Sequence, residues 1–267
     1  MQRSHDHNRR AWDDRVRRSA PHTSPVTRED LQNPYRIIDD CGWLGGNVRG
    51  RRVLCLAAGG GRHGVLFAAA GAQVTVVDLS PAMLELDRER AAAFGLEVQT
   101  LEASMDDLSA LGDANFEIVI QPVSTSYVPD LKPVYGEIAR VTAPGGIYIS
   151  QHKQPGTLQA DLRPTPRGYV VSEAYYRSGP LPEILAECQH REAGTAEFLH
   201  RWSELLGMMC RSGFVIEDLV EPMHGKPEAE PGTFAHRSWF LPPFVTVKAR
   251  RTQAAGQAGQ ETKLWTP

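Results

Sequence analysis

The chain has 267 residues, enough for one α/β domain with additions or for two small domains. A hydrophobic fraction of 41%, a charged fraction of 23% and a net charge of -3 are ordinary for a soluble globular protein and argue against a general nucleic-acid binder, which would carry a basic face. No secretory signal or membrane-spanning run is expected, and four scattered cysteines without a CxxC pair favour a reducing cytoplasm over a disulfide framework or zinc site.

The first elements in chain order are helical, and a regular alternation follows. Apolar residues at steps of three and four predict one helix over 28–43. From residue 53, short apolar runs typical of strands buried on both faces alternate with helical segments. This order predicts a parallel sheet with helices on both faces. The expected strands are 53–58, 73–78, 97–101, 116–120 and 147–150, and the expected helices are 62–70, 81–94 and 131–141.

The rest of the chain breaks this alternation. Residues 153–192 are rich in proline and tyrosine, which indicates an irregular insertion over the carboxyl edge of the sheet. A helix over 198–211 and two closing strands over 213–220 and 243–249 are expected next. The chain therefore divides into a helical cap (1–46), a core (47–152), a substrate-side insertion (153–197), a closing helix and hairpin (198–251) and a disordered polar tail (252–267).

A glycine-rich loop follows the first predicted strand. Gly59, Gly61 and Gly64 match G-x-G-x-x-G between a strand and a helix, where glycine lets the backbone turn sharply and approach a ligand closely. Asp78 ends the next strand, and a carboxylate there can accept hydrogen bonds from both ribose hydroxyls of an adenosine. The combination predicts a nucleotide-type cofactor, either a nicotinamide dinucleotide or S-adenosylmethionine.

Five segments between residues 51 and 150 resemble, in order, the motifs of class I S-adenosylmethionine-dependent methyltransferases. Residues 53–61 are similar to the family's V-L-D-L-G-C-G-x-G motif, and residues 76–84 to its V-x-G-x-D-x-S-x-x-M-L motif. Residues 103–108 resemble the segment that flanks the adenine. Residues 115–119 and 139–146 resemble the entry into the fourth strand and the turn into the fifth, which a dinucleotide dehydrogenase would not require, so the resemblance favours S-adenosylmethionine.

The resemblance implies a fold, a reaction and a set of cofactor contacts. The implied fold is Rossmann-like, a mostly parallel seven-stranded sheet with an antiparallel last strand and helices on both faces. The implied reaction is methyl transfer to a small-molecule acceptor by in-line displacement, with a helix around Trp12 covering the cofactor. Cofactor contacts are expected from Ala57, Gly59, Gly60, Gly61, Arg62, His63, Asp78, Leu79, Met83, Ser104, Met105, Asp106 and Gln121.

Two positions depart from the family's first motif. Cys55 stands where an acidic residue is usual, and Ala57 stands where glycine is usual. The carboxylate that usually anchors the methionine end of the cofactor is therefore missing, and Arg62 and His63 are candidates for other polar contacts. Two alternatives stay open: a non-catalytic module that binds S-adenosylmethionine, and an NAD(P)-dependent oxidoreductase that uses the same loop.

Side chains for the acceptor chemistry are expected beyond the carboxyl ends of the strands. Residues 121–124 differ from the [DNS]-P-P-[YF] motif of enzymes that methylate base amines or glutamine amides. The sequence therefore argues against base amines and glutamine amides as the acceptor. His152 is favoured as a general base, with His200 and Tyr127 as further candidates, against the alternative that these side chains are structural. No pattern predicts a metal site or a nucleic-acid or membrane partner, and the sequence identifies neither the acceptor nor the oligomeric state.

Overall fold

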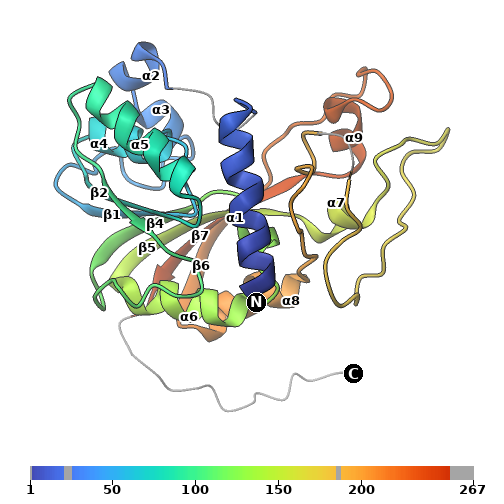
Figure 1. The fold of residues 1–267 in the computed structure, drawn as a ribbon. Helices are drawn as coiled ribbons and strands as arrows, with labels where there is room; N and C mark the ends of the chain where they lie inside the picture. Colours follow the sequence, from blue (N-terminus) through green and yellow to red (C-terminus); the bar gives the residue numbers. More distant parts are fainter. Residues whose placement is uncertain (1, 21–25, 185–187, 253–267) are drawn as a thin grey trace.

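The computed structural model describes residues 2–20, 26–184 and 188–252. Its centre is a seven-stranded sheet of order β3-β2-β1-β4-β5-β7-β6, with β7 antiparallel to both of its neighbours (Figure 1). The expected fold class is confirmed, because the place beside β5 is taken by an antiparallel strand rather than a parallel one. The strands are β1 (Arg52–Leu56), β2 (Gln73–Asp78), β3 (Gln99–Glu102), β4 (Phe116–Gln121), β5 (Thr142–Lys153), β6 (Phe214–Val220) and β7 (Phe244–Arg251).

The apolar strands build two cores, one on each face of the sheet. Leu54 and Leu56 of β1 face the core under α6 (Leu131–Val141) and α8 (Trp202–Arg211). Val53 and Cys55 face the opposite core, which includes Phe67 of α4 (His63–Ala69) and Leu84 of α5 (Pro81–Ala93). Alternate residues of a strand point to opposite faces, so a strand that is apolar throughout is covered by helices on both sides.

The described part of the N-terminal segment contains α1 (Gln2–Arg17), α2 (Arg28–Gln32) and α3 (Tyr35–Ile38). The prediction of one helix over 28–43 is wrong. Pro34 lacks the N–H that would continue the first helix, and α2 ends at Gln32 after starting in a capping box at Thr27. Figure 1 shows α1 lying between the layer of α4 and α5 and the irregular segment that follows β5.

The C-terminal half differs from the expectation in three details. The helix expected from Phe198 begins at Trp202, because the extended residue Phe198 instead donates its backbone N–H to the Ser126 carbonyl at 2.7 Å. The expected turn at 144–146 lies within β5, where the register with β4 shifts. The short helix α7 (Pro155–Gln159) lies in the segment expected to be irregular, and α9 (Phe234–Phe240) lies between the two expected closing strands.

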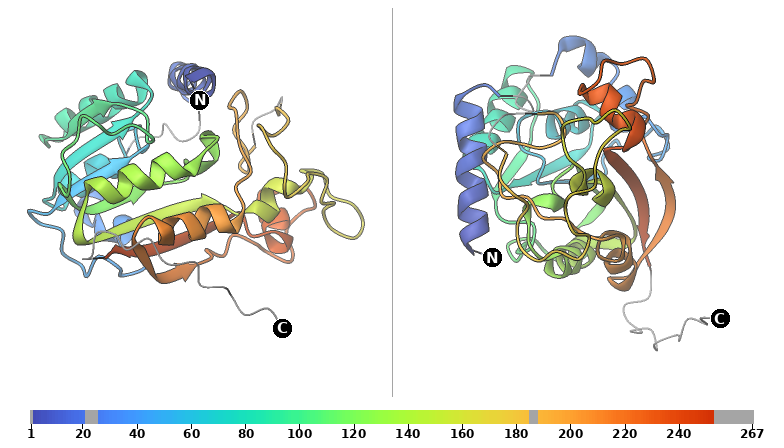
Figure 2. Two further views of the ribbon diagram at one scale, coloured as in Figure 1. Left: turned by 90° about the horizontal axis from the view of Figure 1, so that it is seen from below. Right: turned by 90° about the vertical axis from the view of Figure 1, so that its right-hand side faces the viewer.

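The segment between β5 and α8 extends beyond the edge of the sheet and bends back beside α1 (Figure 2). It therefore closes one side of the space above the carboxyl ends of the strands. Within residues 2–20, 26–184 and 188–252, no helix is long and apolar enough to cross a membrane. The predicted tail, apart from Thr252, lies outside the described residues.

Candidate active site

A cavity of about 360 Å³ lies at the carboxyl ends of the strands, beneath α1. Its walls follow the order of the sheet. One half is lined from the loops after β1, β2 and β3, by Ala57, Ala58, Gly59, Arg62, His63, Asp78, Leu79, Met83, Ala103, Ser104 and Met105. The other half is lined by residues that follow β4, by the end of β5 and the segment after it, and by the first residue of β7: Pro122, Val123, Ser124, Tyr127, Val128, Gln151, Gln189, Glu192 and Phe244. His5, Asn8 and Trp12 of α1 close the top.

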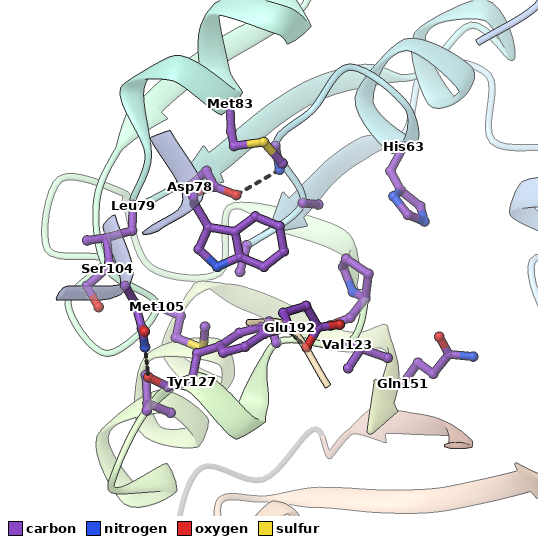
Figure 3. Close-up of a pocket in the computed structure, with 18 of the residues that line it drawn as sticks. His63, Asp78, Leu79, Met83, Ser104, Met105, Val123, Tyr127, Gln151 and Glu192 are labelled. Atoms are coloured by element: carbon purple, nitrogen blue, oxygen red, sulfur yellow. Dashed lines mark hydrogen bonds between the residues drawn. The ribbon is translucent and has the colours of Figure 1, made fainter. Parts of the chain in front are cut away.

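The glycine loop is folded tightly against the end of β2. The Gly59 N–H donates to Asp78 Oδ2 at 2.9 Å (Figure 3). A Cβ at Gly59 would stand 2.8 Å from that same oxygen and from Met83 Cβ, so the close approach requires glycine. Ala57 adopts a φ of 48°, a left-handed conformation in which the family's usual glycine would be unstrained.

Asp87 holds the loop from its far side, and the sequence analysis missed it. This α5 side chain is fully buried, and its Oδ2 accepts the Gly60 N–H at 2.9 Å. Burial raises the pKa of Asp87 to about 7, although the hydrogen bonds that the carboxyl accepts from Gly61 and Gly60 act to lower the pKa. Burial, and to a lesser extent the charge of Asp87, raise the pKa of the Cys55 thiol.

A signal for Asp87 was present in the sequence. It lies four residues from Met83 and four from Ala91, in the buried stripe of α5. A carboxylate on the apolar face of a helix is rarely buried without a partner. The sequence could therefore have suggested that the buried Asp87 carboxylate compensates for the acidic residue that is missing at Cys55.

The other expected cofactor residues divide between the cavity wall and its support. Ala57, Gly59, Arg62, His63, Asp78, Leu79, Met83, Ser104 and Met105 line the cavity, whereas Gly60, Gly61, Asp106 and Gln121 do not. Asp106 instead lies 3.3 Å from Nε2 of His5 on α1. The buried Gln121 amide donates to Ser124 Oγ at 2.9 Å and to Met105 Sδ at 3.3 Å, so it positions lining residues from behind.

The structure corrects the choice of His152 and His200 as acceptor-side bases. Neither lines the cavity. The ring of His152 is fully buried, with Nδ1 3.0 Å from Thr125 Oγ1 and Nε2 2.8 Å from Ser150 Oγ, and burial lowers its pKa to about 3. His200 Nε2 lies 2.9 Å from the Val128 carbonyl. A base must reach the proton that it removes, and both rings instead brace the segment after β4.

Comparison with known proteins agrees with this geometry. A family model described as a methyltransferase domain matches residues 53–146. YbaJ of Bacillus subtilis, an uncharacterized methyltransferase, is 30% identical over 233 residues, which are 82% of this chain and 91% of that protein. The chain belongs to the class I S-adenosylmethionine-dependent methyltransferases. The methyltransferase is thus an enzyme whose cofactor is S-adenosylmethionine.

Two further relatives of the methyltransferase are informative. A solved S-adenosylmethionine-dependent methyltransferase from Mesorhizobium loti has the same fold, with a TM-score of 0.63 at 24% identity over 79% of this chain and 97% of that one. A ubiquinone biosynthesis O-methyltransferase from Bordetella pertussis is 32% identical over 161 residues, 56% of this chain and 65% of that protein.

The residues present fit the cofactor. The Asp78 carboxylate lines the cavity at the end of β2, where it can accept hydrogen bonds from hydroxyl groups. Leu79, Met83 and Met105 provide apolar surface beside it for an aromatic ring. The space that a Cβ at Gly59 would need is already taken by Asp78 and Met83, so the loop backbone itself forms the wall. These features favour S-adenosylmethionine over the NAD(P) of the oxidoreductase alternative.

Proposed function

We propose that the enzyme transfers the methyl group to a small-molecule acceptor bound over the ends of β4, β5 and β7. The observation that carries this proposal is the roof of the cavity. Asn8 of α1 donates to the Tyr127 carbonyl at 2.9 Å and to the Ala196 carbonyl at 3.1 Å, and it accepts the Ala196 N–H at 2.8 Å. The hydrogen bonds join α1 to Tyr127 and to Ala196 on the acceptor side, and they leave a partly covered space suited to a small ligand.

The proposed roles of the side chains follow from their positions. When bound, S-adenosylmethionine supplies an activated methyl group, so the protein mainly has to align the acceptor and exclude water. Asp78 would hold the ribose, and the glycine loop would hold the methionine end. Trp12 packs edge-on against Tyr127, with ring centroids 5.6 Å apart, and separates the reacting groups from solvent.

The name of the Bordetella relative supports this substrate class. It describes an O-methyltransferase of ubiquinone biosynthesis, an enzyme for a small molecule. The acceptor half here has apolar walls, among them Val123, Val128 and Phe244, with polar groups from Gln151 and Glu192. Such a lining suits a mainly apolar acceptor with a few polar groups.

The test uses S-adenosylmethionine with a radiolabelled methyl group and a cell lysate. Label should appear in the small-molecule fraction with the wild-type enzyme. The variant Asp78→Ala, which lacks the proposed ribose contact, serves as the control and should transfer little label. Label that appears only in protein or nucleic acid would contradict a small-molecule acceptor, and no transfer to any fraction would favour a non-catalytic module that binds the cofactor.

A further inference from the structure

A buried cluster of charged side chains lies at the acceptor end of the cavity. Lys153 Nζ lies 2.5 Å from Glu192 Oε2 and 2.6 Å from Glu197 Oε1, and Arg191 Nε lies 2.6 Å from Glu197 Oε2. The formal charges of these two cations and two carboxylates sum to zero. Burying such pairs costs several kcal/mol per ion and is weak evidence for a role in stability alone. A functional reason for the cluster is therefore worth seeking.

Glu192 connects this charged cluster to the cavity. Among these four side chains, all within the described residues, Glu192 lines the cavity and the other three do not. Its Oε2 also accepts the Tyr127 hydroxyl at 2.7 Å. Figure 3 shows Glu192 beside Tyr127, with Val123 and Gln151 on the same side of the cavity and Asp78 and Met83 across from them.

The protonation states around Glu192 follow from burial and charge. Burial lowers the pKa of Lys153, but Glu192 and Glu197 raise it further, so the amine stays an ammonium. Burial and the same two carboxylates hold the pKa of Tyr127 well above its usual value, so the phenol stays protonated. Both neighbours therefore donate to Glu192, and Tyr127 is a donor rather than a base.

Topology places Glu192 near the point of methyl transfer. Tyr127 follows β4, and Lys153 ends β5. In the sheet, β4 lies directly beside β1, which leads into the glycine loop, and on the side away from β2 and Asp78. A ligand held by Asp78 at its ribose and by the glycine loop at its methionine end therefore lies beside the end of β4, where Tyr127 and Glu192 line the cavity.

The other titratable side chains along the described cavity wall are less suited to take a proton from the acceptor. Asp78 accepts the backbone N–H groups of Gly59 and Ser80 and lies at the ribose position. His5 lies beside Asp106 at the opposite end. Burial, and then the charge of Arg62, lower the pKa of His63 to about 4, and His63 lies at the start of α4, directly after the glycine loop.

We propose that Glu192 is the base that accepts the acceptor's proton, and that the acceptor's nucleophile is a hydroxyl or a protonated amine. This inference rests on the proposed function. The proton of the acceptor's O–H or N–H passes to a Glu192 carboxylate oxygen. The electron pair left on oxygen or nitrogen forms the new bond to the methyl carbon, while the carbon–sulfur bond breaks and its pair stays on sulfur. Tyr127 and Lys153 are positioning residues that hold the carboxylate.

A pair of cofactor analogues tests the position of Glu192 without knowledge of the acceptor. In sinefungin a carbon that bears an amine replaces the methylated sulfur, so its ammonium takes the place of the transferred methyl. S-adenosylhomocysteine has no charge there. By calorimetry, Glu192→Gln should weaken sinefungin at least about fivefold more than S-adenosylhomocysteine, because a nearby carboxylate is lost. The matched control Glu197→Gln removes the same charge from Lys153 behind the wall and should leave the affinity ratio unchanged.

Two double variants keep the cluster neutral in case a single change prevents folding. Lys153→Met with Glu192→Gln should lose the preference for sinefungin, whereas Lys153→Met with Glu197→Gln should keep it. An unchanged ratio in both variants that lack the Glu192 carboxylate would overturn the assignment. A wild-type enzyme that binds neither ligand would instead count against the proposed function itself.

Discussion

At the scale of single residues, the most informative pair is Cys55 and Asp87. The acid that the family usually carries in β1 is absent, yet a buried carboxylate reaches the glycine loop from α5 instead. The guanidinium of Arg90, on the same helix, donates to the Gly60 carbonyl, so both backbone polar groups of Gly60 are bound by side chains of α5. The loop is thus anchored from the helix rather than from the strand.

Removal of this anchor should weaken cofactor binding. Asp87→Ala leaves the buried Gly60 N–H with a poorer partner, and we expect a loss of about 1–3 kcal/mol in stability together with weaker binding of S-adenosylhomocysteine. Adding Cys55→Asp to this variant should restore part of the affinity, because it returns a carboxylate to the same face of the sheet. Calorimetry measures both effects. Glu85→Ala, at an exposed site on α5, is the control, and equal affinities in all variants would contradict the anchor.

Asp87 also predicts a dependence of stability on pH. Its pKa is raised from 3.8 to about 7 in the folded protein, so the folded state holds a proton that the unfolded state has lost between these values. Stability from this group therefore falls as the pH rises from about 4 to about 7. In Asp87→Asn this contribution is absent. Urea unfolding across that range should show wild type losing stability relative to the variant, and parallel curves would refute the shift.

At the scale of elements, α1 acts as a roof fixed at both ends of the site. Asp13 accepts the Ser80 hydroxyl at 2.6 Å at the start of α5. Asn8 bonds to the carbonyls of Tyr127 and Ala196 on the acceptor side. The helix therefore crosses from the cofactor half to the acceptor half.

Deletion of residues 1–25 should weaken the binding of S-adenosylhomocysteine, because it opens the cavity beneath Trp12. We expect a loss of about tenfold or more, comparable to a few lost contacts of about 1 kcal/mol each. The single variant Asn8→Ala removes only the hydrogen bonds of α1 to the acceptor side, so its affinity for S-adenosylhomocysteine should fall less. Unchanged affinity by calorimetry in the truncated protein would show that α1 does not cover the cofactor.

At the scale of the whole molecule, cofactor binding should stabilise the folded protein. S-adenosylhomocysteine at about 100 times its dissociation constant should add about 2.7 kcal/mol to the free energy of unfolding. A thermal-shift measurement should therefore show a higher melting temperature with this ligand and an unchanged melting temperature with NADH. Stabilisation by NADH alone would revive the oxidoreductase hypothesis.

The sequence by itself determined the strands of the sheet, the helices between its parallel strands and the glycine loop after the first strand. Runs rich in β-branched residues such as 73–78 and helical periods such as 131–141 are local patterns, and they match β2 and α6 in full. Only the tertiary structure decided which polar side chains reach the cavity. His152 looked suited to catalysis because it follows the predicted fifth strand, yet it is buried in the interior. Glu192 lies in a segment without periodicity and contacts Tyr127, which is 65 residues away in the chain. Such contacts depend on how distant segments pack, and no local pattern records them.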